Sequence, residues 1–346
     1  IFATSGFMDV WDSNSDYGLF KSIDNGKTWT PITNGLEGNV NFGDTAFDPE
    51  NENVVYAVNG LIGKEQGNIF KSDNLGESWS IINIPGGYPE FGGFTSIEIH
   101  YEQSNMMYVS GDGMTLLKSI DSGETWEYMT SGVMSSDNGG SFITGISLDP
   151  DNPNKIYVAS YASGNFRSVN GGETWEEINN HLTFSYTKAL APDYSIRGGG
   201  GVYASSFTNG IHRTSGSLDW QRILNNNLGI NGFARLATTP ADINLIYGVG
   251  DLILTAGKTS TEEFRVSYDK GKNWQIITLP LLTTKFLTIV KDPTRVPVMR
   301  GGKNVFSMGA EVIATTEAHV FSAAIDSTNA NTAYAATIDG GVYRTD

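Results

Sequence analysis

The chain has 346 residues, a formal net charge of −16 at pH 7, 41 glycines and no cysteine. The acidic charge argues against nucleic acid, polyanionic glycans and anionic membranes as partners, because proteins that bind such surfaces carry basic patches. No apolar run is long enough to span a membrane. We therefore expect no nucleic-acid partner and no membrane insertion.

In chain order, the first predicted strand is Ile1–Ser5, which matches the second strand of a repeat whose first strand is missing. After an irregular stretch comes Lys21–Trp29, with the sequence Lys-Ser-Ile-Asp-Asn-Gly-Lys-Thr-Trp. Related segments end at Trp79, Trp126, Trp175, Trp220 and Trp274, at intervals of 50, 47, 49, 45 and 54 residues. A repeat of this length is typical of propeller blades.

The repeat that ends near Trp175 shows four expected strands most clearly. They are Phe142–Leu148, Lys155–Ser160, Gly164–Ser168 and Thr174–Ile178, which are separated by turn-forming residues. Four antiparallel strands in each repeat make one propeller blade. No long segment has a 3.6-residue hydrophobic period, so we expect almost no helix.

The last predicted strands are Phe321–Asp326, Thr332–Thr337 and Gly341–Asp346, and they follow a degenerate stretch between residues 286 and 316. They read as the first three strands of another repeat. Because closure of a ring removes exposed sheet edges, we expect Phe321–Asp326 to complete the blade begun by Ile1, which leaves the final strands surplus.

These elements predict an all-β propeller of seven four-stranded antiparallel blades, with eight blades as the alternative. We expect one domain, 1–346. The incomplete repeats at both ends predict a fragment of a longer chain.

The repeated segment resembles the Asp-box, or bacterial neuraminidase repeat, Ser-x-Asp-x-Gly-x-Thr-Trp. Two copies match it fully, one differs at a single place, two carry Asn for Asp, and one is short and degenerate. The resemblance implies a turn between the third and fourth strands, in which the Asp binds the turn backbone and the Trp packs between blades. The residues given this structural role are Asp24, Trp29, Asn74, Trp79, Asp121, Trp126, Asn170, Trp175, Trp220, Asp269 and Trp274.

In a propeller, the loops after the second and fourth strands of each blade share one face, which we call the long-loop face. Long irregular stretches fall mostly there, and such loops collect binding residues. The expected ligand-binding residues are Trp11, Asp9, Tyr88, Phe91, His181 and Tyr186. Aromatic rings stack on sugar C–H groups and carboxylates accept sugar hydroxyl hydrogens, so these residues suit a neutral glycan. The alternative is that the aromatic rings cover the core.

Asp12, Asn14 and Asp16 place oxygen ligands at the spacing of a calcium loop. Tyr17 stands where such a loop needs glycine, and no bidentate Glu follows, so a solvated turn is the alternative. The four histidines lie far apart and show no metal spacing. We therefore expect no cofactor, with a weak calcium site at these three residues as the alternative.

Asp-box proteins include sialidases, xyloglucan-active glycoside hydrolases of two tandem propellers, sortilin-type receptors and photosystem assembly factors. The Arg-Ile-Pro motif of sialidases is absent, as are the Cys-rich module and ten blades of sortilin-type receptors. A photosystem assembly factor would carry a basic patch, whereas this chain is acidic.

The xyloglucanases are similar in texture and imply one catalytic carboxylate on each of two propellers, facing across a cleft. Their Asp-Ile-Gly-Gly-x-Tyr-Arg motif has a near counterpart in Ile338–Arg344, where the first two residues are exchanged. The exchange moves the acid to the opposite face of the strand.

We favour a secreted or cell-surface recognition or structural propeller that binds a neutral glycan or a protein through the long-loop face, with no catalytic residue assigned. The alternative is a glycoside hydrolase of the xyloglucanase type that acts on neutral β-glucans. A carboxylate pair in an open cleft would distinguish the two hypotheses.

Overall fold

A computed structural model describes the β-sheet framework of the chain. The described residues are 2–4, 18–21, 23, 30–32, 34–36, 41–60, 67–84, 92–100, 102–113, 115–129, 143–161, 163–182, 187–196, 200–206, 210–223, 233–239, 242–250, 264–277, 288–289, 305–306, 320–325, 333–337 and 341–345. Their regular secondary structure consists of strands β1 to β28, without a helix, as the lack of helical periodicity predicts. Within these ranges no helix is long and apolar enough to cross a membrane.

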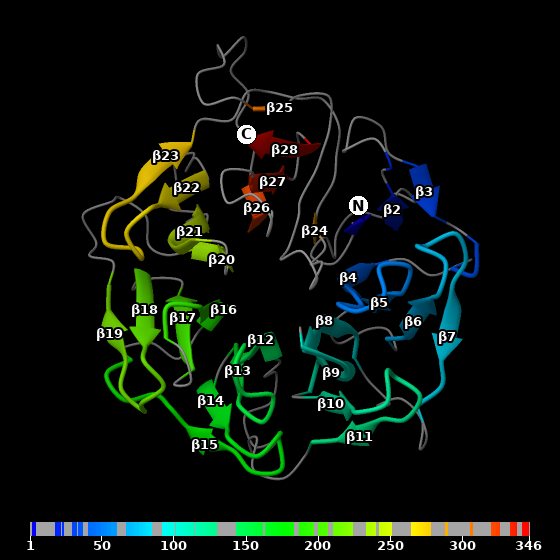
Figure 1. The fold of residues 1–346 in the computed structure, drawn as a ribbon, viewed down its shortest axis with the longest axis horizontal. Coiled ribbons are helices and arrows are strands. Elements are labelled where there is room, and N and C mark those ends of the chain that lie inside the picture. Colours follow the sequence, from blue (N-terminus) through cyan, green and yellow to red (C-terminus); the bar gives the residue numbers. More distant parts are fainter. Residues whose placement is uncertain are drawn as a thin grey trace.

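The described strands form seven four-stranded sheets arranged as blades around a ring, with one edge of each sheet near the ring centre (Figure 1). The first blade runs outward as β24 (Thr288–Ile289), β1 (Phe2–Thr4), β2 (Leu19–Lys21) and β3 (Thr30–Ile32). The second runs as β4 (Phe42–Phe47), β5 (Val55–Asn59), β6 (Ile69–Ser72) and β7 (Ser80–Ile82). The third runs as β8 (Phe94–His100), β9 (Gln103–Gly111), β10 (Leu116–Ser119) and β11 (Glu127–Tyr128).

The fourth blade runs as β12 (Ile143–Leu148), β13 (Ile156–Ser160), β14 (Gly164–Ser168) and β15 (Glu176–Glu177), close to the four strands expected there. The fifth runs as β16 (Thr187–Asp193), β17 (Gly201–Ser206), β18 (Gly210–Thr214) and β19 (Gln221–Arg222). The sixth runs as β20 (Phe233–Thr239), β21 (Asp242–Gly250), β22 (Phe264–Ser267) and β23 (Gln275–Ile277). The seventh runs as β26 (Val320–Ile325), β27 (Ala333–Thr337), β28 (Gly341–Thr345) and β25 (Val305–Phe306).

The all-β propeller is therefore confirmed. In the described strands, six sheets are wholly antiparallel, and the seventh carries β25 parallel to β28.

The closure expected at Phe321–Asp326 is wrong. The first blade is completed by β24, in which Ile289 pairs with Ala3 and Thr288 with Thr4. Strand β26 instead pairs with β27, so the final strands are not surplus. Hairpin neighbours pair at a low cost in loop-closure entropy, which keeps these last strands together in one sheet.

Strands β5 and β13, the second strands of the second and fourth blades, are buried on both of their faces because each of these blades packs between two others. On β5, Val55 and Ala57 belong to an apolar cluster shared with Leu19 of the first blade. The alternate residues Tyr56 and Val58 belong to a cluster shared with the third blade. The two-residue period of a strand thus sends successive side chains into opposite seams between blades.

The turn between the third and fourth strands has the same serine and Asp or Asn hydrogen bonds in four blades, and the turn in the third blade illustrates them together with a tryptophan bond that recurs in the fourth and sixth blades. Ser119 Oγ accepts from the backbone N–H groups of Asp121 at 3.3 Å and Gly123 at 2.9 Å. Asp121 Oδ1 accepts from Thr125 N–H at 2.8 Å, and Trp126 Nε1 donates to Gly123 O at 3.1 Å. The hydroxyl and the carboxylate therefore satisfy backbone donors that would otherwise lack partners.

Asparagine preserves this turn in the second and fourth blades. Asn74 Oδ1 accepts from Ser78 N–H at 2.9 Å, and Asn170 Oδ1 accepts from Thr174 N–H at 3.0 Å. In the sixth blade, Asp269 Oδ1 accepts from Asn273 N–H at 2.8 Å. The tryptophans Trp79, Trp126, Trp175, Trp220 and Trp274 are buried or partly buried in the seams. Asp24 and Trp29 lie outside the described residues.

Candidate functional site

Six of the seven described inner strands carry a β-bulge at the end where the strand begins. The register of the inner strand slips by one residue between Phe42 and Asp44, Phe94 and Ser96, Ile143 and Gly145, Thr187 and Ala189, Phe233 and Arg235, and Val320 and Ser322. This end of the inner strand follows the loop that leaves the fourth strand of the preceding blade, so it belongs to the long-loop face. A bulge redirects side chains and is often found beside a functional site.

Two of the bulge residues use their hydroxyl groups to join blades. Thr95 Oγ1 donates to Ile143 O at 3.0 Å, and Thr144 Oγ1 donates to Thr187 O at 2.8 Å. Each bond runs from one inner strand to the first residue of the next. These two bulges thus link the third, fourth and fifth blades at the rim of the long-loop face.

Asp44 is a buried carboxylate on this rim, directly after the bulge in β4. Its Oδ1 accepts from Thr45 N–H at 2.9 Å, and its Oδ2 accepts from Ser96 Oγ at 3.0 Å and Ile97 N–H at 3.3 Å. Both oxygens therefore bind donors, and two of these belong to the third blade. This arrangement suits a carboxylate that fixes two blades relative to each other better than a general base, which needs a free lone pair.

Close glycine contacts anchor two of the long loops between the second and third blades. Gly60 has φ +116°, and a Cβ on it would lie 2.6 Å from Gly93 Cα and 2.8 Å from Gly67 Cα. Gly67 N–H also donates to Gly92 O at 3.1 Å. Only residues without a side chain allow the backbone to approach this closely. Both ends of loop 61–66 therefore lie beside the residues that follow loop 85–91.

Asp112 lies beside this anchor, in the hairpin between β9 and β10. Its N–H donates to Gly93 O at 3.1 Å, and its Oδ1 accepts from Gly113 N–H at 2.8 Å. A Cβ on Gly92, which has φ +120°, would lie 2.4 Å from Asp112 Cβ, so the glycine makes room for the acid. The side chain is partly exposed. It is thus a carboxylate accessible from the long-loop face.

Sequence reasoning missed both acids. Asp44 was signalled by a charge inside the otherwise uncharged strand Phe-Gly-Asp-Thr-Ala-Phe, and Asp112 by the Gly-Asp-Gly turn after a second strand.

Most of the residues predicted to bind a ligand or calcium lie outside the described residues. These are Asp9, Trp11, Asp12, Asn14, Asp16, Tyr88, Phe91 and Tyr186. Their roles stay predictions. In the described part of the chain, no three His, Asp or Glu side chains gather as they would around a metal ion.

His181 is described and lies away from the glycine anchor. It is exposed, with φ +63°, and its Nδ1 lies 3.4 Å from Asp219 Oδ1. The neighbouring Asn180 forms an isolated bridge with Asp219, and its carbonyl accepts from Trp220 N–H at 3.2 Å. His181 therefore lies where the fourth blade meets the fifth, and its role in ligand binding stays a prediction.

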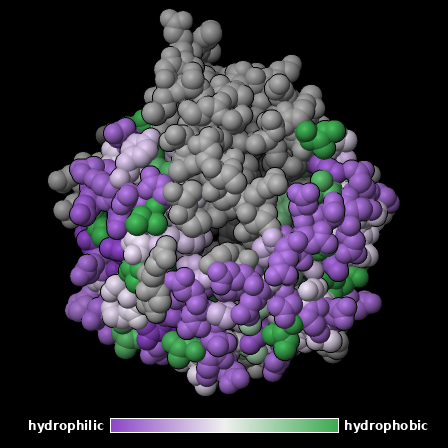
Figure 2. Space-filling view, viewed as in Figure 1, coloured by the Kyte–Doolittle hydropathy of each residue, from purple (hydrophilic) through white to green (hydrophobic). Residues whose placement is uncertain are grey.

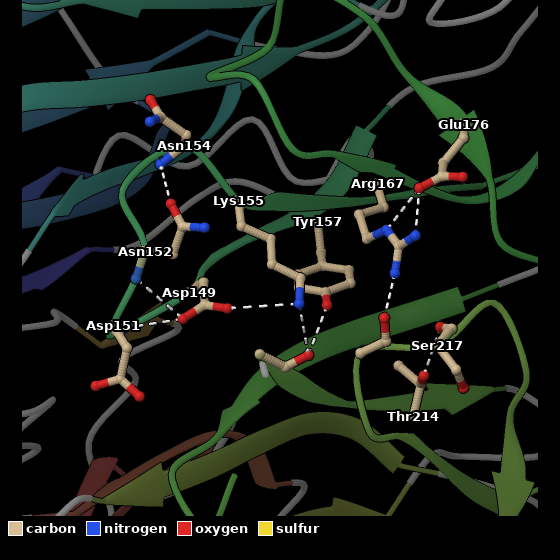
Figure 3. A network of polar contacts seen from close by, with 12 residues as sticks. Asp149, Asp151, Asn152, Asn154, Lys155, Tyr157, Arg167, Glu176, Thr214 and Ser217 are labelled. Carbon is tan, nitrogen blue, oxygen red and sulfur yellow. Dashed lines mark hydrogen bonds and ion pairs between the residues drawn. The ribbon is translucent and has the colours of Figure 1, made fainter. Parts of the chain in front are cut away.

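A polar network joins the same two blades (Figure 3). Tyr157 donates its hydroxyl to Gly200 O at 2.7 Å, and Lys155 Nζ lies 3.4 Å from the same oxygen and 3.8 Å from Asp149 Oδ2. Burial raises the pKa of Tyr157 to about 12, so its hydroxyl stays protonated and donates at neutral pH. Because these groups bind one another, we interpret the network as a link between blades.

The described surface in Figure 2 is largely hydrophilic, with apolar residues in small separate patches. Several exposed apolar residues occupy one position of the repeat, the second residue of the turn between the third and fourth strands. They are Ile23, Ile120, Val169 and Tyr268. Single exposed apolar residues of this kind are normal on a soluble surface and mark no site.

Comparisons with known proteins show which sequences and structures resemble this chain. No sequence profile of a known protein family matches the chain. A curated xyloglucanase of Hypocrea jecorina is 28% identical over 135 residues, which cover 34% of this chain and 16% of that protein.

Two solved enzymes of similar fold cover nearly the whole chain. The GH74 enzyme of Niastella koreensis has a TM-score of 0.67 at 16% identity, covering 95% of this chain and 50% of that one. The GH74 xyloglucanase of Xanthomonas campestris has a TM-score of 0.64 at 14% identity, and the match covers 95% of this chain and 51% of that one. A structure of YCF48 bound to a D1 peptide has a TM-score of 0.53 at 12% identity, and the match covers 89% of this chain and 94% of that one.

The chain spans about half the length of these two GH74 structures and a smaller share of the curated xyloglucanase. At these identities the solved structures establish the β-propeller fold. The seven described sheets and the similar solved structures therefore agree on a β-propeller fold.

Proposed function

We propose that the chain acts on a neutral β-glucan of the xyloglucan class, as one propeller of a glycoside hydrolase. The observation that carries this proposal is the 28% identity over 135 residues to a xyloglucanase. The net charge of −16 supports an uncharged substrate, because a polyanionic glycan would be repelled. The long-loop face would bind the glycan, with Trp11 and Tyr88 stacking on sugar rings.

Two acids are the first catalytic candidates. The xyloglucanase resemblance places a carboxylate in an Asp-Ile-Gly-Gly motif, whose counterpart here spans the hairpin between β27 and β28 and contains Asp339. Asp112 occupies the corresponding hairpin of the third blade, after its second strand, and is partly exposed. Either acid would protonate the glycosidic oxygen or activate water, with a second carboxylate opposite.

The second candidate function is recognition of the same glycan without hydrolysis. The exchange of Ile338 and Asp339 relative to the motif favours it, because the acid would then face away from the cleft. The protein would in that case be a secreted or cell-surface binding module.

The test is calorimetric binding of xyloglucan oligosaccharides together with release of reducing ends from xyloglucan. Hydrolysis that is lost in Asp112→Asn or Asp339→Asn supports the first proposal. Binding without release, abolished in the Trp11→Ala/Tyr88→Ala double variant, supports the second. Tyr268→Ala is the matched control, since it removes an exposed tyrosine from a turn between third and fourth strands. If the unaltered chain neither binds the oligosaccharides nor releases reducing ends, both proposals are refuted.

A further inference from the structure

The seams between successive blades share three core positions, which we compare by strand register. One is the first residue of the inner strand, and the other two are adjacent residues of the third strand that point into opposite seams. In the first three seams all three positions are apolar and belong to one cluster per seam. The sets are Leu19, Phe42 and Phe70; Ile69, Phe94 and Leu117; and Leu116, Ile143 and Phe166.

The seam between the fourth and fifth blades, which we call the fourth seam, carries polar residues at all three positions. Asn165 pairs with Ala159 on β13, one residue before Phe166, and so corresponds to Leu116. His212 pairs with Ala204 on β17 and corresponds to Phe166. Thr187 begins β16, as Ile143 begins β12. The apolar cluster of this seam, around Tyr157, Val202 and Trp220, includes none of the three.

These side chains are buried as completely as the apolar ones they replace. Asn165 and Thr187 are each 1% exposed, and His212 is 2% exposed. Within the described part of the chain, neither the amide of Asn165 nor the hydroxyl of Thr187 has a hydrogen-bond partner. Each such group costs about 1–3 kcal/mol when it is buried without a partner. Two unsatisfied groups in one seam therefore point to a ligand that supplies the missing bonds.

The same substitutions reduce the bulk of the side chains in the seam. In the first seam the Phe42 and Phe70 rings lie 5.6 Å apart, centroid to centroid. Thr187 and His212 occupy these two positions in the fourth seam, and both have fewer side-chain atoms than phenylalanine. A buried water needs both space and two to four polar partners. The fourth seam offers smaller side chains together with amide, hydroxyl and imidazole groups.

The chemistry of the three groups selects an uncharged ligand. Burial, and secondarily the positive charge of Arg222, lowers the pKa of His212 to about 4, so its ring is neutral at pH 7. Amide, hydroxyl and neutral imidazole offer donors and acceptors but no net charge. A buried ion would need a charged partner, whereas water needs only hydrogen bonds.

We infer that the fourth seam is a binding site for internal water, held by the amide of Asn165 and the hydroxyl of Thr187 beside His212. This site adds a hydrated contact between the fourth and fifth blades beside their apolar cluster, whereas the same three positions of the first three seams are apolar. The inference is independent of the glycan proposed above.

The direct test is a crystal structure of the unaltered chain at a resolution that shows ordered water. We expect a water within about 2.7–3.2 Å of both Thr187 Oγ1 and an Asn165 amide atom. The inference is overturned if these atoms bond directly to protein groups, or if no water lies between them.

A second test measures whether the two side chains share one water. Asn165→Leu and Thr187→Ile introduce residues used at the same positions of the third seam. We expect each to lower the folding equilibrium constant about tenfold, and the double variant to lose far less than the hundredfold of independent sites. Ile69→Leu, at the Asn165 position of an apolar seam, is the control and should leave the ordered water unchanged. Additive losses, or a gain in stability from either single variant, would overturn the inference.

Discussion

His212 makes the stability of the propeller depend on pH. Its folded pKa is about 4, against an ordinary value of 6.5, because burial disfavours the charged ring. Between pH 6.5 and 4 the unfolded chain therefore binds a proton that the folded chain does not. The free energy of unfolding has its full value above pH 6.5 and falls as the pH decreases towards 4. The total loss is about 3 kcal/mol, since each pH unit of difference corresponds to about 1.4 kcal/mol.

The assay is urea unfolding of the unaltered chain and of His212→Leu at pH 7.5 and pH 4.5. Leucine is the residue at this position in the third blade, so it suits the site sterically. Burial also lowers the pKa of His100, but this histidine is common to both proteins and cancels in the comparison. We expect the unaltered chain to lose about 2–3 kcal/mol more than the variant between the two pH values. Equal losses in the two proteins would refute the reasoning.

Three further substitutions test the links that hold the blades. Ser119→Ala should lower the free energy of unfolding by about 1–3 kcal/mol, because the buried Gly123 N–H loses its acceptor, and unchanged urea unfolding would contradict this. Tyr157→Phe should cost about 1 kcal/mol by removing the hydroxyl bond to Gly200 O, and a stabilised variant in thermal unfolding would argue against that link. Asp44→Ala should cost about 2–4 kcal/mol, since three hydrogen bonds lose their acceptor, and amide exchange no faster than in the unaltered chain would show that the carboxylate is dispensable.

Much of the propeller could be predicted from the sequence because the strands and turns of most blades are formed by consecutive segments of the chain. Asn74 and Asn170 depart from the Asp-box pattern but form the same turn, since an amide oxygen accepts the same backbone bond as a carboxylate. The alternation on β5 likewise follows from its sequence, Val-Tyr-Ala-Val-Asn, read with a two-residue period.

The pairing of distant segments could not be predicted in this way. Strand β24 is only Thr288–Ile289 and carries no turn signal, yet it completes the first blade. The polar residues of the fourth seam were equally hidden, because Asn165 and His212 look like surface residues until register places them in the core. Function lay beyond reach for a further reason, since a blade repeat specifies a scaffold and the acids of a site belong to individual loops.

The pairing of β1 with β24 bears on how the protein is made. Ala3 pairs with Ile289, so the first blade stays incomplete on the ribosome until the segment around Thr288 has emerged. Until then β1 presents an unpaired edge on which another chain could add a strand. Such a long-range contact also slows folding, because its loop must close before the pairing stabilises anything. The pairing of β1 with β24 thus makes completion of the first blade a late event, and the edge of β1 is open to misassembly until then.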